Sequence, residues 1–487
     1  MPGPDGKTSG LVLHYEGRDD WAPRVDPHLA QALDAKLAEQ AAAHSAIKIE
    51  PRLLDQYVGR YGNAQVEITA ASDGGQLSGL VTRRTLLAGS AASLLAAPWV
   101  ARAQANTLRI GMQSILSGPI ALLGTSSRNA LTIEQDRINA TGGFLGRPIE
   151  FVFRDSKGQP QEAARVAREL VNSTGCELLV DAEASSASFA VQEVVRDLGV
   201  ACIHTNSETS SLTADPKIRA PTAFRVARQG VHDAVAGSLY LAEYAKAKKL
   251  DKWATCSPDY AYGRDTTAQY LQFFKKFKPD VEVIAEAWPK LGQPDFTEVI
   301  TKLLQAKPQA LFSLLYAGDL SAFVNQGNVY ALFSQMTVAT PNVDYPVMAA
   351  IKNLPAGIQS ATRYLDTFPN TPANKEWGQA YLKKWNERPT NWSWQNTVAM
   401  QFYEAAIKKA NSLDGKALAA ALVGTKIDTP FGFDGTITMR DDHTTIGYAI
   451  GWGQTIPKEP FIVDVKAADW GKIIELETEW KKQQNYI

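Results

Sequence analysis

Cysteine is scarce in this chain of 487 residues, which contains only Cys176, Cys202 and Cys256. An odd number of cysteines excludes a complete disulfide framework. Each of the three lies in an apolar run typical of a strand, so we expect buried and inert thiols. A bridge between Cys176 and Cys202 stays the alternative, because an apolar run does not fix the distance between two thiols.

Motifs for catalysis and for nucleotide binding are also absent. The chain has no Gly-x-Ser-x-Gly, no Walker loop, no His-Glu-x-x-His, no Cys-x-x-Cys and no Gly-x-Gly-x-x-Gly after a strand. Histidine offers little in their place, because His232 and His443 are isolated in polar surroundings and His204 ends an apolar run. We therefore expect no enzyme, no metal and no cofactor.

The chain lacks an excess of either charge and lacks a membrane-spanning run. Its 50 basic and 51 acidic residues nearly cancel, which excludes a global attraction to nucleic acid or to an anionic membrane. The longest apolar run, Leu86–Ala101, has 16 uncharged residues. A span needs roughly 20, so we expect a soluble product once this run is removed.

That apolar run has the order of parts of an export signal. The basic segment Val81-Thr82-Arg83-Arg84 precedes it, and the small-x-small sequence Ala103-Gln104-Ala105 follows it. We predict a signal peptide over 81–105 and a mature protein in the periplasm that begins at Asn106. The two arginines are similar to a twin-arginine signal, and the general secretory route is the alternative.

Residues 1–80 show too little pattern to bury a core. They contain one helical run, His28–Ala43, and one strand-like run, Gln65–Thr69. Because a signal normally stands first, we expect 1–80 to be a doubtful leader, mostly disordered or wrongly assigned, with the true start at Val81. A short stretch, Leu54–Tyr61, is similar to the tail domain of serine β-lactamase-like esterases, which makes a hydrolase the remotest alternative.

From Leu108 onward, strand-like runs alternate with amphipathic helical runs, first over one series and then over a second. This order predicts right-handed βαβ crossovers and parallel sheets covered on both faces, in two α/β lobes. The expected strands are Leu108–Met112, Ile149–Arg154, Glu177–Val180, Val200–His204, Ala223–Val226, Trp253–Cys256, Val281–Ala287, Ala310–Leu315, Met336–Ala339 and Gly357–Asp366, followed by a β-rich end at Gly432–Gly453. The expected helices are Ala130–Asn139, Gln161–Val171, Phe189–Leu198, Thr266–Phe277, Phe296–Ala306, Leu320–Phe333, Ala373–Asn386, Thr397–Ala410 and Gly415–Leu422.

Several short motifs resemble the branched-chain amino-acid binding proteins of ABC importers. The matching residues are Ser117-Gly118-Pro119, Asn139–Gly143, Gly146–Ile149, Asp155, Ser185-Ser186, Leu212-Thr213, Phe224-Arg225, Tyr262-Gly263, Asp295-Phe296 and Thr429-Pro430-x-Gly432. This resemblance covers essentially all of 106–487 and implies the type I periplasmic binding protein fold. Two Rossmann-like lobes would be joined by three crossovers, with the ligand in the cleft between them. Lobe 1 would comprise 106–227 and 357–440, and lobe 2 would comprise 228–356 and 441–487.

A candidate anion site follows the expected strand Glu177–Val180. The segment Asp181–Ser186 leads directly into a helix, whose free N–H groups and positive dipole end favour a carboxylate. Ser185 and Ser186 would add hydroxyl donors to this site. We expect one of them to be the N-cap of the helix, which is compatible with ligand binding by the other.

The resemblance implies further contacts from both lobes. The loop after the next strand would supply Asn206, Ser207 and Thr209 to the polar head of the ligand. Tyr262 and Tyr316 match aromatic lining positions in the second lobe, and core packing is the alternative for both.

Two departures from the family pattern argue against an α-amino acid as the ligand. Asn342 falls where amino-acid binders carry an acid that pairs with the ligand ammonium, although Asp344 or Glu208 remains able to supply that charge. Leu123 replaces an aromatic residue of the family near the first loop.

The resulting hypothesis is a periplasmic receptor that captures a small polar organic ligand, such as an amino acid or an amide. It would deliver the ligand to an inner-membrane ABC permease through closure of the two lobes. A sensory receptor of the same fold, acting on a receptor or kinase, is the principal alternative.

Overall fold

The computed structural model describes the backbone of residues 10–15, 18–23, 59–62, 66–73 and 76–83 and the whole of residues 107–487. The chain divides into two compact units, Met1–Ala96 and Ala97–Ile487. In the first unit β1 (Gly10–Tyr15) pairs with β2 (Arg18–Pro23), and β3 (Gly59–Gly62), β4 (Val66–Asp73) and β5 (Gln76–Arg83) form an antiparallel sheet. The expected helix His28–Ala43 and the expected signal beyond Arg83 lie outside the described residues.

The first lobe of the second unit is built on a five-stranded parallel sheet with the order β10-β9-β8-β6-β7. Its strands are β6 (Leu108–Ser114), β7 (Ile149–Asp155), β8 (Leu178–Ala182), β9 (Ala201–His204) and β10 (Ala223–Arg225). Its helices are α4 (Leu122–Ala140), α5 (Pro160–Asn172), α6 (Ser185–Leu198), α7 (Ser211–Ala214), α14 (Pro372–Trp385), α15 (Asn391–Ala410) and α16 (Gly415–Leu422). A small sheet of β16 (Lys426–Asp428), β17 (Thr436–Met439) and β18 (Thr445–Ile446) completes the lobe.

The central strand β8 shows why this sheet is apolar throughout. All five of its residues are buried, because helices cover both faces of the sheet. Leu179 packs into the cluster formed by α5 and α6, whereas Leu178 and Val180 belong to the cluster on the opposite face. That opposite face carries Leu131 of α4 and Met400 of α15.

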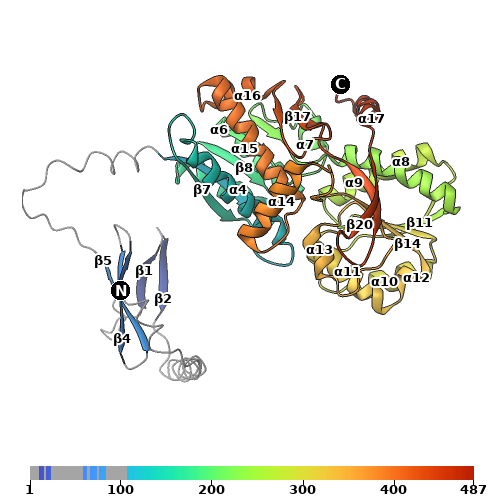
Figure 1. Ribbon diagram of the computed structural model, residues 1–487, viewed down its shortest axis with the longest axis horizontal. Helices are drawn as coiled ribbons and strands as arrows, with labels where there is room; N and C mark the ends of the chain where they lie inside the picture. The colour runs from blue at the N-terminus through green and yellow to red at the C-terminus, as the bar shows by residue number, and fades with distance from the viewer. Residues whose placement is uncertain (1–9, 16–17, 24–58, 63–65, 74–75, 84–106) are drawn as a thin grey trace, which may run out of the picture. The chain divides into compact units, whose positions relative to one another are not determined.

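The second lobe is built on a seven-stranded sheet with the order β12-β11-β13-β14-β15-β19-β20. Its strands are β11 (Lys252–Cys256), β12 (Glu282–Ala287), β13 (Ala310–Ser313), β14 (Thr337–Thr340), β15 (Gln359–Ala361), β19 (Gly451–Thr455) and β20 (Ile462–Ala467). Its helices are α8 (Gly230–Lys248), α9 (Ala261–Phe277), α10 (Thr297–Ala306), α11 (Ala317–Val329), α12 (Leu332–Gln335), α13 (Tyr345–Ala350) and α17 (Trp470–Gln483). Figure 1 shows the two lobes side by side, with α4, β8 and α15 in one and α11 and β14 in the other.

Three chain crossings join the lobes, from β10 to α8, from β15 to α14 and from β18 to β19. The second of these lies later than the expected boundary at residue 357. Gly357–Asp366 was expected as one strand, but only Gln359–Ala361 pairs, with β14 and β19 of the second sheet. The start of the segment 357–440, expected in lobe 1, therefore lies in the second lobe.

Several local expectations about helices need correction. The expected helix Leu320–Phe333 is two helices, α11 and α12, because Ala331 takes a left-handed conformation with φ of 52°. The patterns did not predict α8, whose first residues, Gly230–Ser238, are all buried. Polar residues in this buried stretch erase the amphipathic stripe that marks a surface helix. His232, expected in polar surroundings, is one of these residues and is fully buried.

The expectation for the cysteines is confirmed. Cys176, Cys202 and Cys256 are free, buried thiols, and no bridge joins Cys176 to Cys202. Burial raises the pKa of Cys176 to about 11, so this thiol stays protonated and inert at neutral pH. Among the residues that the structure describes, no helix combines the length and the apolar composition needed to cross a bilayer.

Candidate ligand-binding site

A cavity lies between the two lobes, and most of its lining residues directly follow the ends of parallel strands. This edge is where open α/β sheets bind ligands, because loops and helix N-termini converge there. The lining residues are Leu123, Ala184, Ser185, Asn206, Glu208, Tyr260, Tyr262, Tyr316, Asn342, Asp344, Arg363 and Trp392.

The N-terminus of α6 forms one wall of the cavity. Ala184 is the N-cap of this helix, and no side chain caps it, so the expectation that Ser185 or Ser186 is the N-cap is wrong. Both serines are already helical, and the Ser185 Oγ accepts the backbone N–H of Thr209 at 3.3 Å instead. The Ser185 hydroxyl keeps its own proton, which is available to a ligand.

The second serine, Ser186, forms a hydrogen bond from the first lobe to the second. The Ser186 Oγ accepts the backbone N–H of Ala261, at the start of α9, at 3.5 Å. Ser186 does not line the cavity. The two neighbouring serines therefore differ in role, because one faces the cavity and the other contacts the opposite lobe.

The loop after β9 contributes Asn206 and Glu208 to the cavity. The Asn206 Nδ2 donates to the Ser127 Oγ at 2.9 Å and to the Ala182 carbonyl at 3.2 Å, which fixes the amide within the first lobe. Ser207 and Thr209, expected beside Asn206, are buried but do not line the cavity.

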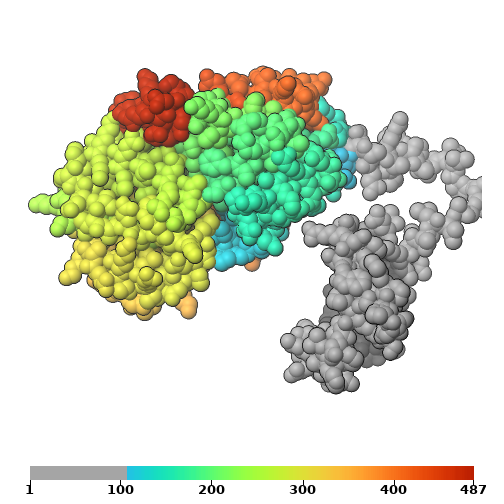
Figure 2. All heavy atoms as spheres, turned by 180° about the vertical axis from the view of Figure 1, so that it is seen from behind, coloured from blue at the N-terminus to red at the C-terminus, as the bar shows by residue number. Residues whose placement is uncertain are grey.

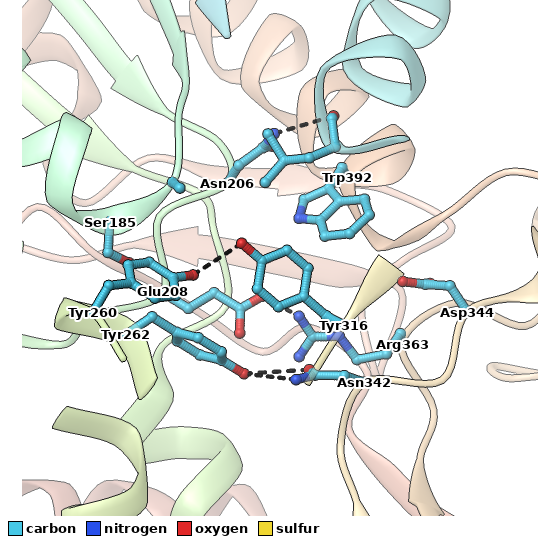
Figure 3. A pocket seen from close by; sticks show the side chains of 12 residues that line it. Ser185, Asn206, Glu208, Tyr260, Tyr262, Tyr316, Asn342, Asp344, Arg363 and Trp392 are labelled. Carbon is cyan, nitrogen blue, oxygen red and sulfur yellow. Dashed lines mark hydrogen bonds and ion pairs between the residues drawn. The ribbon is translucent and has the colours of Figure 1, made fainter. Parts of the chain in front are cut away.

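Aromatic side chains form the opposite wall (Figure 3). The Tyr260 hydroxyl donates to the Tyr316 hydroxyl at 3.1 Å, and the Tyr262 hydroxyl lies 3.2 Å from the Asn342 Oδ1. The ring of Tyr316 meets that of Trp392, from the first lobe, edge to face with centroids 6.0 Å apart. Burial raises the pKa of Tyr262, so this hydroxyl is neutral at physiological pH.

A buried network of ion pairs lies at the base of the cavity. Arg363 pairs with Glu208 through its Nη2 and with Asp233 through its Nη1, at 3.1 Å for the latter. Arg228 pairs with the same Asp233, and its Nη1 donates to the Ala449 carbonyl at 3.2 Å. Burial raises the pKa of Asp233, but the attraction of Arg228 outweighs it and leaves this pKa below its ordinary value.

Asp344 is a further carboxyl group on the cavity wall. Its Oδ1 accepts the backbone N–H of Asn391 at 2.9 Å. Burial raises its pKa to about 6, against the opposing attraction of Arg363. Asp344 is therefore close to its titration range at physiological pH.

The cavity contains five of the eight residues singled out from the sequence. These are Ser185, Asn206, Tyr262, Tyr316 and Asn342, whereas Ser186, Ser207 and Thr209 do not line it. Sequence reasoning missed Tyr260, Arg363 and Trp392 as lining residues. Tyr260 stands two places before Tyr262 in one segment, which was a usable signal, but Arg363 and Trp392 carried none. Within residues 107–487 no group of three or more His, Cys, Asp and Glu side chains is placed to hold a metal ion.

The lobes meet beside the cavity. A Cβ atom on Gly318, near the start of α11, would lie 2.3 Å from the Pro119 carbonyl oxygen of the first lobe. Such a contact leaves room only for glycine. Figure 2 shows the green part of the first lobe and the yellow part of the second pressed together over most of this face. This arrangement is the closed form of a two-lobed protein.

Two α/β lobes, three crossings and a cavity at the facing strand ends define a two-lobed solute-binding protein. Residues 107–450 match the family described as periplasmic binding protein. The chain belongs to this family. The match confirms the predicted family, the predicted fold class and the predicted role as a receptor for a small solute.

Two relatives with similar sequences are both named for the binding of leucine, isoleucine and valine. The Leu/Ile/Val-binding protein homolog 4 of Brucella melitensis is 24% identical over 383 residues, which cover 74% of this chain and 86% of that protein. The leucine-, isoleucine-, valine-, threonine-, and alanine-binding protein of Pseudomonas aeruginosa is 25% identical over 334 residues, 67% of this chain and 85% of that protein.

Solved structures share the fold. The solute binding protein of an ABC transporter from Rhodopseudomonas palustris, in complex with 3,4-dihydroxy benzoic acid, has a TM-score of 0.67 and 23% identity and covers 75% of this chain and 97% of that one. LivJ from Streptococcus pneumoniae, in complex with isoleucine, has a TM-score of 0.65 and 20% identity and covers 74% of this chain and 99% of that one.

Proposed function

We propose that this protein captures a small organic acid in the periplasm and delivers it to an inner-membrane ABC permease. The observation that carries the proposal is the cavity itself, because both lobes line it and a ligand there touches both. A ligand shifts an equilibrium between open and closed forms only through such differential contacts. Hinge closure around a ligand is the motion that binding proteins of this kind use.

The acid group of the ligand would lie at the N-terminus of α6. The first N–H groups of a helix have no partner inside it, and the helix dipole favours an anion there. Ser185 lines the cavity and adds a hydroxyl donor at this end.

The body of the ligand would lie among the aromatic rings. Tyr260, Tyr262, Tyr316 and Trp392 provide flat apolar surface with hydroxyl groups at the edges. Relatives are named for aliphatic amino acids, and a protein of the same fold binds 3,4-dihydroxy benzoic acid. An aromatic wall on this chain supports a ring-bearing acid over a purely aliphatic one.

A thermal-shift screen of the predicted mature protein, residues 106–487, tests this function. Aromatic acids, hydroxy acids, amino acids, amides and sugars would be added one by one, and the melting temperature would be measured. A true ligand at 100 times its Kd stabilises the folded state by about 2.7 kcal/mol. The proposal predicts stabilisation by an organic acid, and no shift with any small solute would contradict it.

A further inference from the structure

We infer that Arg363 selects against ligands that carry an ammonium group, so that the ligand is an organic acid with a neutral hydrogen-bond donor such as a hydroxyl. The inference rests on the proposed function, since it specifies the chemistry of the ligand in the same cavity. It concerns one pair of buried charges, Arg363 and Glu208, whose side chains are 4% and 5% exposed.

Glu208 is a carboxylate of the cavity wall to which a ligand cation would bind, but Arg363 already pairs with it. The Glu208 Oε1 pairs with the Arg363 Nη2 and also accepts the Asn391 Nδ2–H at 3.3 Å. Figure 3 shows the Glu208 carboxylate and the Arg363 guanidinium turned toward each other below Tyr316. A second cation at this place would meet repulsion from Arg363 in a medium that screens charge weakly.

The ion pairs closest to Arg363 and Glu208 are balanced in charge. Arg228 and Arg363 together face Glu208 and Asp233, which gives two positive and two negative groups. Asp344 is the other carboxyl on the cavity wall, and Arg363 is the cation that attracts it most. Arg363 thus pairs with Glu208 and Asp233 and also attracts Asp344, so three carboxyl groups share the guanidinium groups of Arg228 and Arg363.

One oxygen of this network nevertheless has no partner. The Glu208 Oε2 is buried and accepts no hydrogen bond from any described residue. A buried acceptor without a donor is costly, and a ligand O–H or amide N–H would satisfy it without adding charge. The position fits a donor close to the acid group, because the neighbouring Thr209 N–H is bonded to the Ser185 Oγ at 3.3 Å.

Matched pairs of ligands test the inference on the wild-type protein. Lactate and alanine, mandelate and phenylglycine, and phenyllactate and phenylalanine differ only in a hydroxyl against an ammonium. Isothermal titration calorimetry would give the ratio of Kd values within each pair. For any pair that fits the cavity, we expect the hydroxy acid to bind about tenfold tighter or more.

Variants at Arg363 show whether this residue causes the preference. Arg363→Met removes the cation that pairs with Glu208, so the preference within each pair should shrink or invert by about tenfold. Arg363→Lys keeps the charge and should keep the preference. Arg388→Met removes an arginine that pairs with Asp366 and Glu459 outside the cavity lining, and should leave the ratio unchanged.

The double variant Glu208→Gln with Arg363→Met separates the effect of the Glu208 charge on ammonium binding from the effect of the room that Arg363→Met opens. It opens the same room as Arg363→Met but removes the carboxylate, so the gain for ammonium ligands should disappear. A gain that persists in the double variant would overturn the inference.

The outcomes separate this inference from the proposed function. Amino acids that bind the wild type as tightly as their hydroxy acids would overturn the inference alone, as would an unchanged ratio in Arg363→Met. Binding of other solutes without binding of any hydroxy acid would also overturn it. A protein that binds no solute at all contradicts the proposed function. Should Arg363→Met not fold, the wild-type ratios and Arg363→Lys still decide.

Discussion

The carbonyl oxygen of Pro119 in the first lobe occupies the place where a side chain on Gly318 of the second lobe would begin. The distance from that oxygen to an ideal Cβ atom is 2.3 Å, well inside van der Waals contact. Neither residue lines the cavity, yet their contact requires the two lobes to be closed. The pair therefore reports on closure independently of ligand contacts.

Gly318→Ala should weaken ligand binding without weakening the fold. Alanine favours a helix over glycine by about 1 kcal/mol, so α11 itself is stabilised. Full closure, however, would force a clash with Pro119, and we expect at least a tenfold rise in Kd, about 1.4 kcal/mol. Calorimetry and chemical unfolding measure the two effects. Ser321→Ala, on the same helix, is the matched control, and equal Kd values for the two variants would contradict closure at this contact.

Ser185 and Ser186 should differ in their effect on affinity. Ser185 faces the cavity and has a hydroxyl proton to donate, whereas Ser186 contacts Ala261 outside it. Ser185→Ala should cost about 1 kcal/mol of binding, roughly a fivefold rise in Kd. Ser186→Ala should change the Kd by less than that, and the reverse order of effects would show that the acid group lies elsewhere.

Asp344 should lower stability at neutral pH. Its pKa is raised from 3.8 to about 6 by burial, so the folded state binds its proton more tightly than the unfolded state does. This contribution to stability is fully present below pH 3.8 and is lost as the pH rises through about 6. Asp344→Asn should therefore be more stable than the wild type at pH 7 by up to about 3 kcal/mol.

Urea unfolding from pH 3 to pH 8 measures this difference. The gap between Asp344→Asn and the wild type should open between pH 3.8 and about 6. Asp428→Asn, at an exposed position of β16, controls for a general charge effect. A gap that is constant over the whole range would mean that the carboxyl does not titrate there.

Glu477 should fasten α17 to α8 of the second lobe and to the segment between β17 and β18 of the first lobe. Its carboxylate lies 3.2 Å from the His232 Nε2 and accepts two hydrogen bonds from Arg440, at 2.6 and 2.7 Å. Burial raises its pKa, but His232 and Arg440 hold it well below 4.5, so its stabilisation is lost as the pH falls through that region.

Glu477→Gln should destabilise the protein by about 2 kcal/mol at pH 7, because Arg440 and Lys481 lose the charged hydrogen-bond acceptor Glu477 and keep Asp442 as their other ion-pair partner. Thermal unfolding measures the loss. Glu475→Gln, two residues earlier and exposed, should be close to neutral. Similar melting temperatures for both variants would refute the role of Glu477.

The export prediction concerns residues 81–105. N-terminal sequencing of the protein recovered from the periplasm should find Asn106 first. Replacement of Arg83 and Arg84 by lysine should block export if the twin-arginine route is used and should leave it intact if the general secretory route is used. A periplasmic product that carries residues from 1–80 would contradict the signal.

Helices and strands were predictable from the sequence where their apolar residues recur with a clear period. The strand Leu178–Ala182 and the helix Pro160–Asn172 were expected within two residues, because burial against a sheet leaves a clear apolar pattern in each. The helix α8 was missed because its buried part includes polar residues, such as Asp233, which pairs with Arg228 just before the helix. Gly357–Asp366 was too long as a strand, since the apolar pattern does not record where backbone pairing stops.

The sequence by itself determined the two-lobed α/β architecture and the strand ends at which a ligand site belongs. Those features depend on periodicity and on short segments, so Ser185, Asn206 and Tyr316 were within reach. Only the tertiary structure decided the charges of the site. Arg363 meets Glu208 across 155 positions of the chain and meets Asp233 across 130. Electrostatic pairing acts through space and leaves no local pattern in the sequence. Only the folded chain therefore determines which carboxylates pair with arginine and which remain available to a ligand.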